Sequence, residues 1–316
     1  MPSKWSKIAI ETLLILVGFA LASAPFAESS KLAQQWIAKM QAASRQLSYD
    51  GVFIFQLGQD QRTVKVSHQV DRGRLYERIS YQDGPINERI RTSLATACHS
   101  ATYIPPNAAD YYQFETLGET RIAGRSAYKV RVRPKDRLRF GYIYGIDQQT
   151  DLLLESRLMS QADLSLEYFK YVDIHMASSP DDLAAMVEHL SAEDTDTADC
   201  IDSLQSVDDW VVNWLPLGFT QVSAKRLTGG RYSMVYTDGL AVFSVLIDEI
   251  IDRDVLPSLR AQIGATQVVA INQSFNDSYF RIAVSGQLPQ ATANEIARSV
   301  APVQRHSVTV NKETET

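Results

Sequence analysis

The sequence predicts an α+β protein with two domains, a larger N-terminal domain built on a curled antiparallel sheet and a smaller α+β domain after it. The chain has 316 residues, which is long for a single core. Short stretches of alternating apolar and polar residues follow one another with turn residues between them, and segments with helical spacing are few. Short strands joined by turns favour an antiparallel sheet that curls.

The composition excludes several classes of protein. With 45% hydrophobic and 22% charged residues, the chain is neither disordered, nor collagen-like, nor a polytopic membrane protein. Its 31 Lys and Arg against 37 Asp and Glu give a net charge of −6, so no nucleic-acid partner is expected. The charge is uneven, because residues 72–139 carry a net +6 and residues 171–224 a net −11. Local binding of an anion therefore stays open.

Residues 1–27 are typical of a secretory signal. Lys4 and Lys7 form a short basic segment, an apolar run follows at residues 13–21, and small residues come after it. The apolar run is shorter than the ~20 residues of a membrane-spanning helix, which argues against an uncleaved anchor. We therefore expect cleavage after Ala24 or Ala27 and a soluble exported protein.

The larger domain is assigned to residues 28–190. Apolar residues at helical spacing predict an amphipathic helix over residues 32–47. Ser179 as an N-cap, followed by Pro180, predicts a second helix that closes the domain. Alternation predicts strands near residues 64–70, 128–132, 142–146 and 164–168.

An acidic linker at residues 191–209 leads to the smaller domain, assigned to residues 210–303. A helix is expected there near residues 291–300, and residues 304–316 form a polar tail. Its expected strands lie near residues 232–236, 240–247, 267–271 and 279–284.

No constellation of catalytic or cofactor-binding residues emerges from the sequence. The five histidines are scattered singly, and no pair has metal-ligand spacing. The nearest match to a nucleophile elbow, residues 124–128, lacks its second glycine and precedes a strand. We therefore expect a protein that is not an enzyme and carries no cofactor or metal. A hydrolase whose site is assembled from distant residues is the alternative.

Basic residues occupy alternate positions around a turn predicted at residues 134–137. Strands flanking this turn would place several of the charges on one sheet face. One interpretation is a solvated outer face that blunts strand edges. The other is a docking face for phosphates or an acidic peptide, because guanidinium groups bind such oxygens bidentately. The candidate anion or partner contacts are Lys129, Arg131, Arg133, Arg137 and Arg139.

The aromatic and aliphatic residues of the predicted strands also have two interpretations. They form an ordinary core, or a curled, unclosed sheet leaves a concave apolar face that holds acyl chains. The candidates to line such a face are Phe53, Phe55, Tyr142, Tyr144, Leu164 and Leu166.

Cys98 and Cys200 are the two cysteines of the chain and lie 102 residues apart. In an exported protein two lone thiols tend to pair, and closing a loop of this size stabilises a fold by ~4–5 kcal/mol. We predict a disulfide between them, and two unrelated thiols are the alternative.

Several short strings occur in the order found in a known family. In the larger domain they are RIAGR at residues 121–125, PKD at 134–136 and RFG at 139–141. In the smaller domain they are WLPLGF at residues 214–219, DGLAVFSV at 238–245 and GQLP at 286–289. The chain thereby resembles the RseB/MucB family, periplasmic regulators of the sigma-E envelope-stress response. Some members carry a cysteine pair at corresponding places, which adds weight to the predicted disulfide.

The resemblance implies a larger domain that is an unclosed half-barrel like the lipoprotein carrier LolA, with a lipid-accessible concave face. The smaller domain would help to bind the periplasmic part of a membrane-spanning anti-sigma factor of the RseA/MucA type, and so shield it from regulated proteolysis. Lipid or lipopolysaccharide would release that partner. A periplasmic carrier of lipid or lipoprotein, of LolA type, is the alternative, and a homo-oligomer stays open.

Overall fold

The computed structural model describes residues 28–71, 74–84, 88–94, 104–177, 196–197, 209–250 and 257–303. Several predictions concern residues outside these ranges. They are the secretory signal, the helix beginning at Ser179, most of the acidic linker, the polar tail, and both Cys98 and Cys200.

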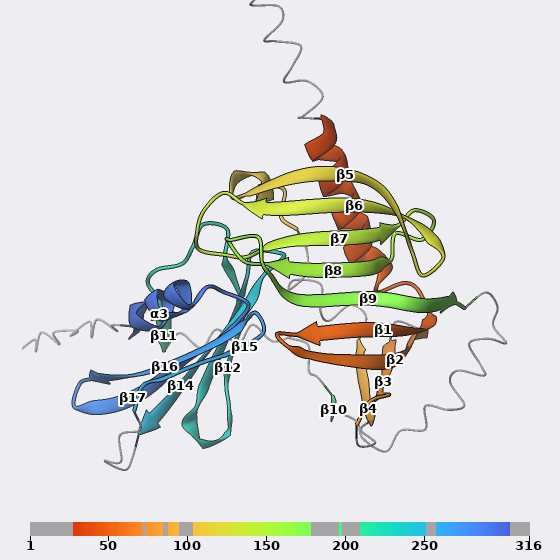
Figure 1. Ribbon diagram of the computed structural model, residues 1–316. Helices are drawn as coiled ribbons and strands as arrows, with labels where there is room; N and C mark the ends of the chain where they lie inside the picture. The colour runs from red at the N-terminus through yellow and green to blue at the C-terminus, as the bar shows by residue number, and fades with distance from the viewer. Residues whose placement is uncertain are drawn as a thin grey trace, which may run out of the picture.

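The larger domain is a single curled sheet. Its strands are β1 (Tyr49–Leu57), β2 (Asp60–Asp71), β3 (Arg74–Tyr81), β4 (Glu88–Leu94), β5 (Tyr112–Ile122), β6 (Arg125–Pro134), β7 (Gly141–Asp147), β8 (Leu153–Met159), β9 (Ser165–Met176) and β10 (Asp196–Thr197). They lie in the order β10-β4-β3-β2-β1-β9-β8-β7-β6-β5 (Figure 1). Two antiparallel meanders, β1 to β4 and β5 to β9, join where β1 pairs with β9. No described residues pair β5 with β4 or β10, so the predicted unclosed sheet is confirmed.

Bulges help to bend this sheet. The pairing register shifts beside Phe53 in β1, Gly118 in β5, Ile146 in β7 and Met159 in β8. A bulge bends its strand and increases the local twist. In Figure 1 the strands β3 and β4 accordingly turn away from the plane of β5 to β9.

The helix at residues 28–43 crosses one face of the sheet, which is therefore the concave, covered face (Figure 1). Ala33, Ile37 and Met40, at helical spacing, are buried against it. Trp36 stacks on Tyr128 of β6, with the ring centroids 3.9 Å apart. The predicted amphipathic helix is thus confirmed, but it begins and ends four residues earlier than the pattern at residues 32–47 suggested.

The strands predicted from alternation are present. In β6, Val130 and Val132 are buried, whereas Arg131 and Arg133 between and after them point to the other face. The segment after β6 differs from the prediction, because the next strand does not begin until Gly141. Residues 135–140 form a loop, so the basic residues of this loop are not carried by a second strand.

The smaller domain is a six-stranded antiparallel sheet with a helix on one face. Its strands are β12 (Thr220–Arg226), β13 (Tyr232–Thr237), β14 (Val242–Ile250), β15 (Leu259–Ile263), β16 (Thr266–Phe275) and β17 (Ser278–Gly286), in the order β12-β13-β14-β17-β16-β15. Helix α3 (Gln290–Ser299) packs on β16 and β17 through Ala293, Ile296 and Ala297. A ribbon of β11 (Trp210–Val212) and β18 (Val300–Pro302) joins the two ends of the domain. The four predicted strands and the terminal helix are confirmed.

Strand β10 lies within the predicted acidic linker and pairs in parallel with β4. Asp196 lies opposite Arg91, and Thr197 lies opposite Thr92. Thr197 precedes Cys200 by three residues and Thr92 precedes Cys98 by six. The described parts of β4 and β10 are therefore neighbours in space.

The disulfide stays a prediction with a direct measurement. Titration of the chain from residue 28 with a thiol reagent, after unfolding without reductant, should find no reactive thiol. Treatment with reductant before the titration should expose two thiols and should lower the midpoint of thermal unfolding, because a closed loop of this length restricts the unfolded chain. Two reactive thiols in the unreduced protein would show that Cys98 and Cys200 are not paired.

Candidate functional site

An apolar cavity lies inside the curve of the larger sheet. Its volume is about 350 Å³. Three parts of the chain surround it: the helix at residues 28–43, the concave face of the sheet, and two loops of the smaller domain. Among its lining residues are Met40 and Gln41 from the helix, Phe55, Tyr144, Leu158 and Phe169 from the sheet, and Gly239, Leu240 and Gln287 from the smaller domain.

The predicted lining residues are only partly brought together. Phe55, Tyr142 and Tyr144 line the cavity. Phe53 belongs to an adjoining aromatic cluster, with its ring centroid 4.7 Å from that of Phe169. The other two candidates, Leu164 and Leu166, do not line it.

Leu164 corrects the expectation from alternation. It is 65% exposed in the turn between β8 and β9, because β9 begins only at Ser165. Leu166 is partly buried against the core without reaching the cavity. Residues 167–169 line the cavity instead.

The cavity is lined by neutral groups apart from one carboxylate. Burial raises the pKa of Tyr142 and of Tyr144 above the ordinary value of a phenol, so both stay uncharged. The Tyr142 hydroxyl has no hydrogen-bond partner among the described residues. The carboxylate belongs to Glu167, which accepts hydrogen bonds from the Ala265 amide at 2.9 Å and from Gln287 Nε2 at 3.2 Å. Glu167 thus ties the cavity wall to the smaller domain.

A buried ion pair joins the two domains beside the cavity. Arg139, in the loop after β6, places Nη1 2.6 Å from Oδ2 of Asp238, in the turn between β13 and β14. Both side chains are 0% exposed. The Tyr112 hydroxyl donates to the same Asp238 oxygen at 2.9 Å, and the Tyr111 hydroxyl donates to the Asp238 main-chain carbonyl at 3.1 Å. We call Tyr111, Tyr112, Arg139 and Asp238 the domain latch.

The guanidinium of Arg139 is fully engaged. Nη2 donates to the Leu217 carbonyl at 2.6 Å, and Nε donates to the Asp136 carboxylate at 3.2 Å. The group also lies over the ring of Tyr111, 4.7 Å from its centroid. Burial alone would lower the pKa of Arg139, but the surrounding acidic groups raise it above the ordinary value, so the charge persists.

The carboxylate of Asp238 is equally well satisfied. Its second oxygen, Oδ1, accepts from the amides of Leu240 at 3.0 Å and Ala241 at 2.8 Å, which fixes the turn after β13. A buried charge pair is tolerated only when its polar atoms are paired in this way. Gly239 and Leu240, which follow Asp238 directly, form part of the cavity wall. The latch and the cavity therefore share one loop.

Arg139 requires a correction to the sequence prediction. The alternation of basic residues places it with Arg131 and Arg133 as a contact for an anion or a partner. The structure buries it completely, and its donors are used by Asp136, Leu217 and Asp238. Its partner is the second domain of the same chain.

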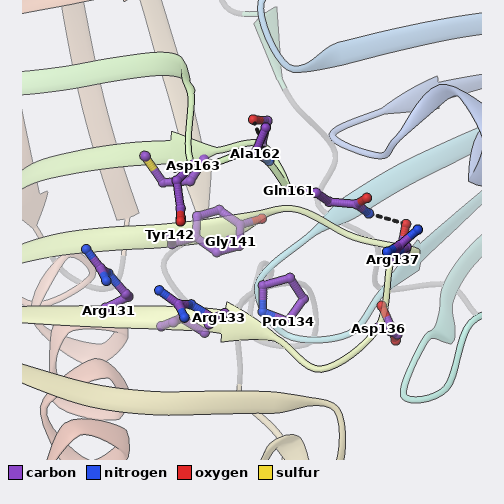
Figure 2. A pocket seen from close by; sticks show the side chains of 13 residues that line it. Arg131, Arg133, Pro134, Asp136, Arg137, Gly141, Tyr142, Gln161, Ala162 and Asp163 are labelled. Atoms are coloured by element: carbon purple, nitrogen blue, oxygen red, sulfur yellow. Dashed lines mark hydrogen bonds between the residues drawn. The ribbon is translucent and has the colours of Figure 1, made fainter.

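The remaining basic candidates lie on the outer face of the sheet or in the loop after β6. Lys129 pairs with Glu155, with 3.6 Å between Nζ and Oε2. Arg131, Arg133 and Arg137 line a second hollow of about 420 Å³, with Arg137 at the opposite end from Arg131 (Figure 2). This hollow and the concave cavity share one lining residue, Tyr142.

The described residues contain no group of three or more side chains suited to hold a metal ion. Within the same part of the chain, no helix is both long enough and apolar enough to cross a membrane. The described residues form two domains, and an apolar cavity with a lining from both of them opens at their contact, as in a two-domain binding protein.

Comparison with known proteins shows the family to which the chain belongs. Residues 32–192 match the MucB/RseB N-terminal domain, and residues 205–301 match the MucB/RseB C-terminal domain. The chain belongs to the MucB/RseB family.

Characterised relatives span almost the same length. The sigma factor AlgU regulatory protein MucB of Pseudomonas aeruginosa is 29% identical over 92% of this chain and 97% of its own. The sigma-E factor regulatory protein RseB of Escherichia coli is 24% identical over 95% of this chain and 98% of its own. The crystal structure of MucB in complex with the periplasmic part of MucA superposes with a TM-score of 0.68 at 28% identity, covering 86% of this chain and 100% of that one.

The sequence missed the residues that join the domains. Tyr111, Tyr112 and Asp238 carry no spacing that marks an interface, and Leu217 contributes only its carbonyl. One signal was available in Gly218, where φ is +90° and a Cβ would overlap the ring of Tyr111. A glycine beside an apolar loop marks such a close approach, although it does not name the partner.

Proposed function

We propose that this protein is a periplasmic regulator of a sigma-E type factor and that it binds the periplasmic domain of a membrane-spanning, MucA-type anti-sigma factor. The observation that carries the proposal is the match of both domains, in order, to the MucB/RseB family. The likeness to MucB bound to the periplasmic part of MucA supports the choice of partner. Binding on a folded surface would keep the anti-sigma segment out of the extended form that a protease cleaves, and so shield it from regulated proteolysis.

The cavity is proposed to receive lipid, including the acyl chains of lipopolysaccharide. Its wall is apolar, and burying each methylene of an acyl chain contributes about 0.8 kcal/mol. A ligand can shift the partner equilibrium only if it binds the partner-free conformation better. The loop at residues 238–240 belongs to both the cavity wall and the domain latch. It would therefore allow lipid to bind the partner-free conformation more tightly than the partner-bound one.

The loop at residues 238–240 is held from three sides. Arg139 binds the side chain of Asp238, Tyr111 binds its carbonyl, and Gln41 Nε2 of the helix donates to the Gly239 carbonyl at 2.9 Å. An acyl chain that enlarges the cavity would press on Gly239 and Leu240 and so strain the latch. The smaller domain would then turn, and the partner would be released.

A lipid or lipoprotein carrier of LolA type is the second candidate. The same apolar cavity favours it. The smaller domain counts against it, because Leu240 and Gln287 cover part of the cavity and a carrier gains nothing from that obstruction.

One binding experiment separates the two functions. The chain from residue 28 would be titrated with the fluorescently labelled periplasmic domain of a MucA-type anti-sigma factor, with and without lysophospholipid or lipopolysaccharide. The regulator should bind the partner without lipid and lose at least tenfold in affinity with it. Binding of lipid without any binding of the partner would favour the carrier, and no partner binding in either condition would contradict the proposed regulator.

A further inference from the structure

The hollow around Arg131, Arg133 and Arg137, which we call the arginine hollow, lies at the end of β6 where the loops at residues 135–140 and 160–164 meet (Figure 2). Arg131 and Arg133 alternate with Val130 and Val132, which are buried on the helix-covered face. The two strand arginines therefore point to the opposite face from the concave cavity. Arg137 comes from the loop.

Arg131, Arg133 and Arg137 form no ion pair within the described part of the chain, although Glu115 of β5 lies directly opposite Arg131 in the sheet. Nearby on the same sheet, Arg125 pairs with Asp147 at 2.5 Å, and Glu155 pairs with both Lys129 and Arg157 at 3.6 and 2.9 Å. Three guanidinium groups around one hollow repel one another and create a local positive potential. An anion in the hollow would relieve this repulsion.

The carboxylates in the wall do not neutralise the site. Asp136 is bound by Arg139 and by the Leu138 amide. Asp163 is exposed in the turn before β9, with a left-handed backbone at φ +56°. Two carboxylates outside any ion pair, Asp163 in the wall and Glu115 opposite Arg131 on β5, thus stand against three guanidinium groups, and the balance of charge stays positive.

Gly141 lies in the wall of the hollow and packs closely against β6. A Cβ on Gly141 would lie 2.9 Å from the Val132 carbonyl and 3.2 Å from Cδ of Pro134, so a larger residue would displace β6. The hollow has a volume of about 420 Å³, which exceeds the size of a single side-chain carboxylate.

We propose that the arginine hollow binds a phosphate monoester. A phosphate carries nearly two negative charges at neutral pH, and its oxygens can accept hydrogen bonds from several directions at once. Arginines on a strand and on a loop approach from such different directions, whereas a planar carboxylate is satisfied by one guanidinium. The ester is either a soluble phosphate or the headgroup of a lipid, and the two arms of the test distinguish them. The proposal does not rest on partner binding or on lipid in the concave cavity, although Tyr142 lines both hollows.

The test measures binding of two probes to the full exported chain. Glycerol 3-phosphate is titrated by calorimetry, and vesicles of phosphatidylcholine with and without phosphatidic acid are tested by co-sedimentation. We expect phosphate-dependent binding in at least one arm, and the arm that binds identifies the source of the ester. Arg131→Gln, Arg133→Gln and Arg137→Gln should each weaken it about tenfold, since charge-assisted hydrogen bonds are lost.

Two further variants sharpen the result. Arg260→Gln, on the exposed strand β15, changes the net charge equally and should leave binding unchanged. Asp163→Asn should strengthen binding, because it removes the opposing charge and Asn tolerates the left-handed backbone. Binding that is absent in both arms, or that falls equally in Arg260→Gln, would overturn the proposal. An acidic peptide that binds in place of phosphate, with the same dependence on the three arginines, would also overturn it.

Discussion

Replacing Arg139 with methionine should uncouple the two domains. The substitution leaves the Asp238 carboxylate buried and without its cation, and breaking a buried pair in this way costs about 3–5 kcal/mol. Because the pair lies between domains, the loss should appear in domain docking more than in either core. We expect calorimetry to resolve two unfolding transitions, and small-angle scattering to show a larger radius of gyration than for the unmodified protein.

Two variants control this experiment. Arg125→Met removes another Arg–Asp pair, with Asp147, that lies wholly within the larger domain. It should lower the thermal midpoint without changing the scattering curve. Adding Asp238→Asn to Arg139→Met removes the stranded charge while the asparagine oxygen can still accept from the Leu240 and Ala241 amides. The double variant should recover much of the docking, and an Arg139→Met protein that scatters and unfolds like the unmodified one would show that the latch does not hold the domains.

The latch variant also bears on the proposed function. If lipid releases the partner by straining the loop at residues 238–240, Arg139→Met should bind the anti-sigma segment weakly even without lipid. The remaining effect of lipid on that affinity should then be small, because the conformational equilibrium has already been shifted.

The parts of the fold that local pattern could predict are those in which neighbours along the chain share one environment. Ala33, Ile37 and Met40 all meet the sheet, and Val130 and Val132 both meet the helix, so their spacing alone identified the buried face. Leu164 shows where local pattern fails. The alternation continues to Leu164, but β9 begins one residue later, at Ser165.

Arg139 shows a different limit. In the sequence it continues the series of alternate basic residues that includes Arg131 and Arg133, and nothing local distinguishes it. It is buried because Asp238, 99 residues away, provides its counter-charge in another domain. The contact between the domains depends on such distant pairs, and so does the part of the cavity wall that the smaller domain contributes. Phe55, Tyr142 and Tyr144, in contrast, could be selected from strand composition alone.

Replacing Ser156 with tryptophan should close the concave cavity. Cross-strand pairing places Tyr144, Ser156, Phe169 and Phe55 in one row on the concave face, and all four line the cavity. Ser156 is the smallest member of this row, so an indole there would occupy space that an acyl chain needs. Each excluded methylene removes about 0.8 kcal/mol, and exclusion of four weakens lipid binding about 200-fold.

This variant separates lipid binding from partner binding. Lysophosphatidylcholine is the suitable probe, because its zwitterionic headgroup has little affinity for the arginine hollow. Ser156→Trp should bind the anti-sigma segment like the unmodified protein but should not release it when the lipid is added. Ser126→Trp, at an exposed position of β6, introduces the same ring outside the cavity and should respond normally. If Ser156→Trp still binds lysophosphatidylcholine with unchanged affinity, the lipid lies elsewhere, and the coupling through Gly239 and Leu240 loses its starting point.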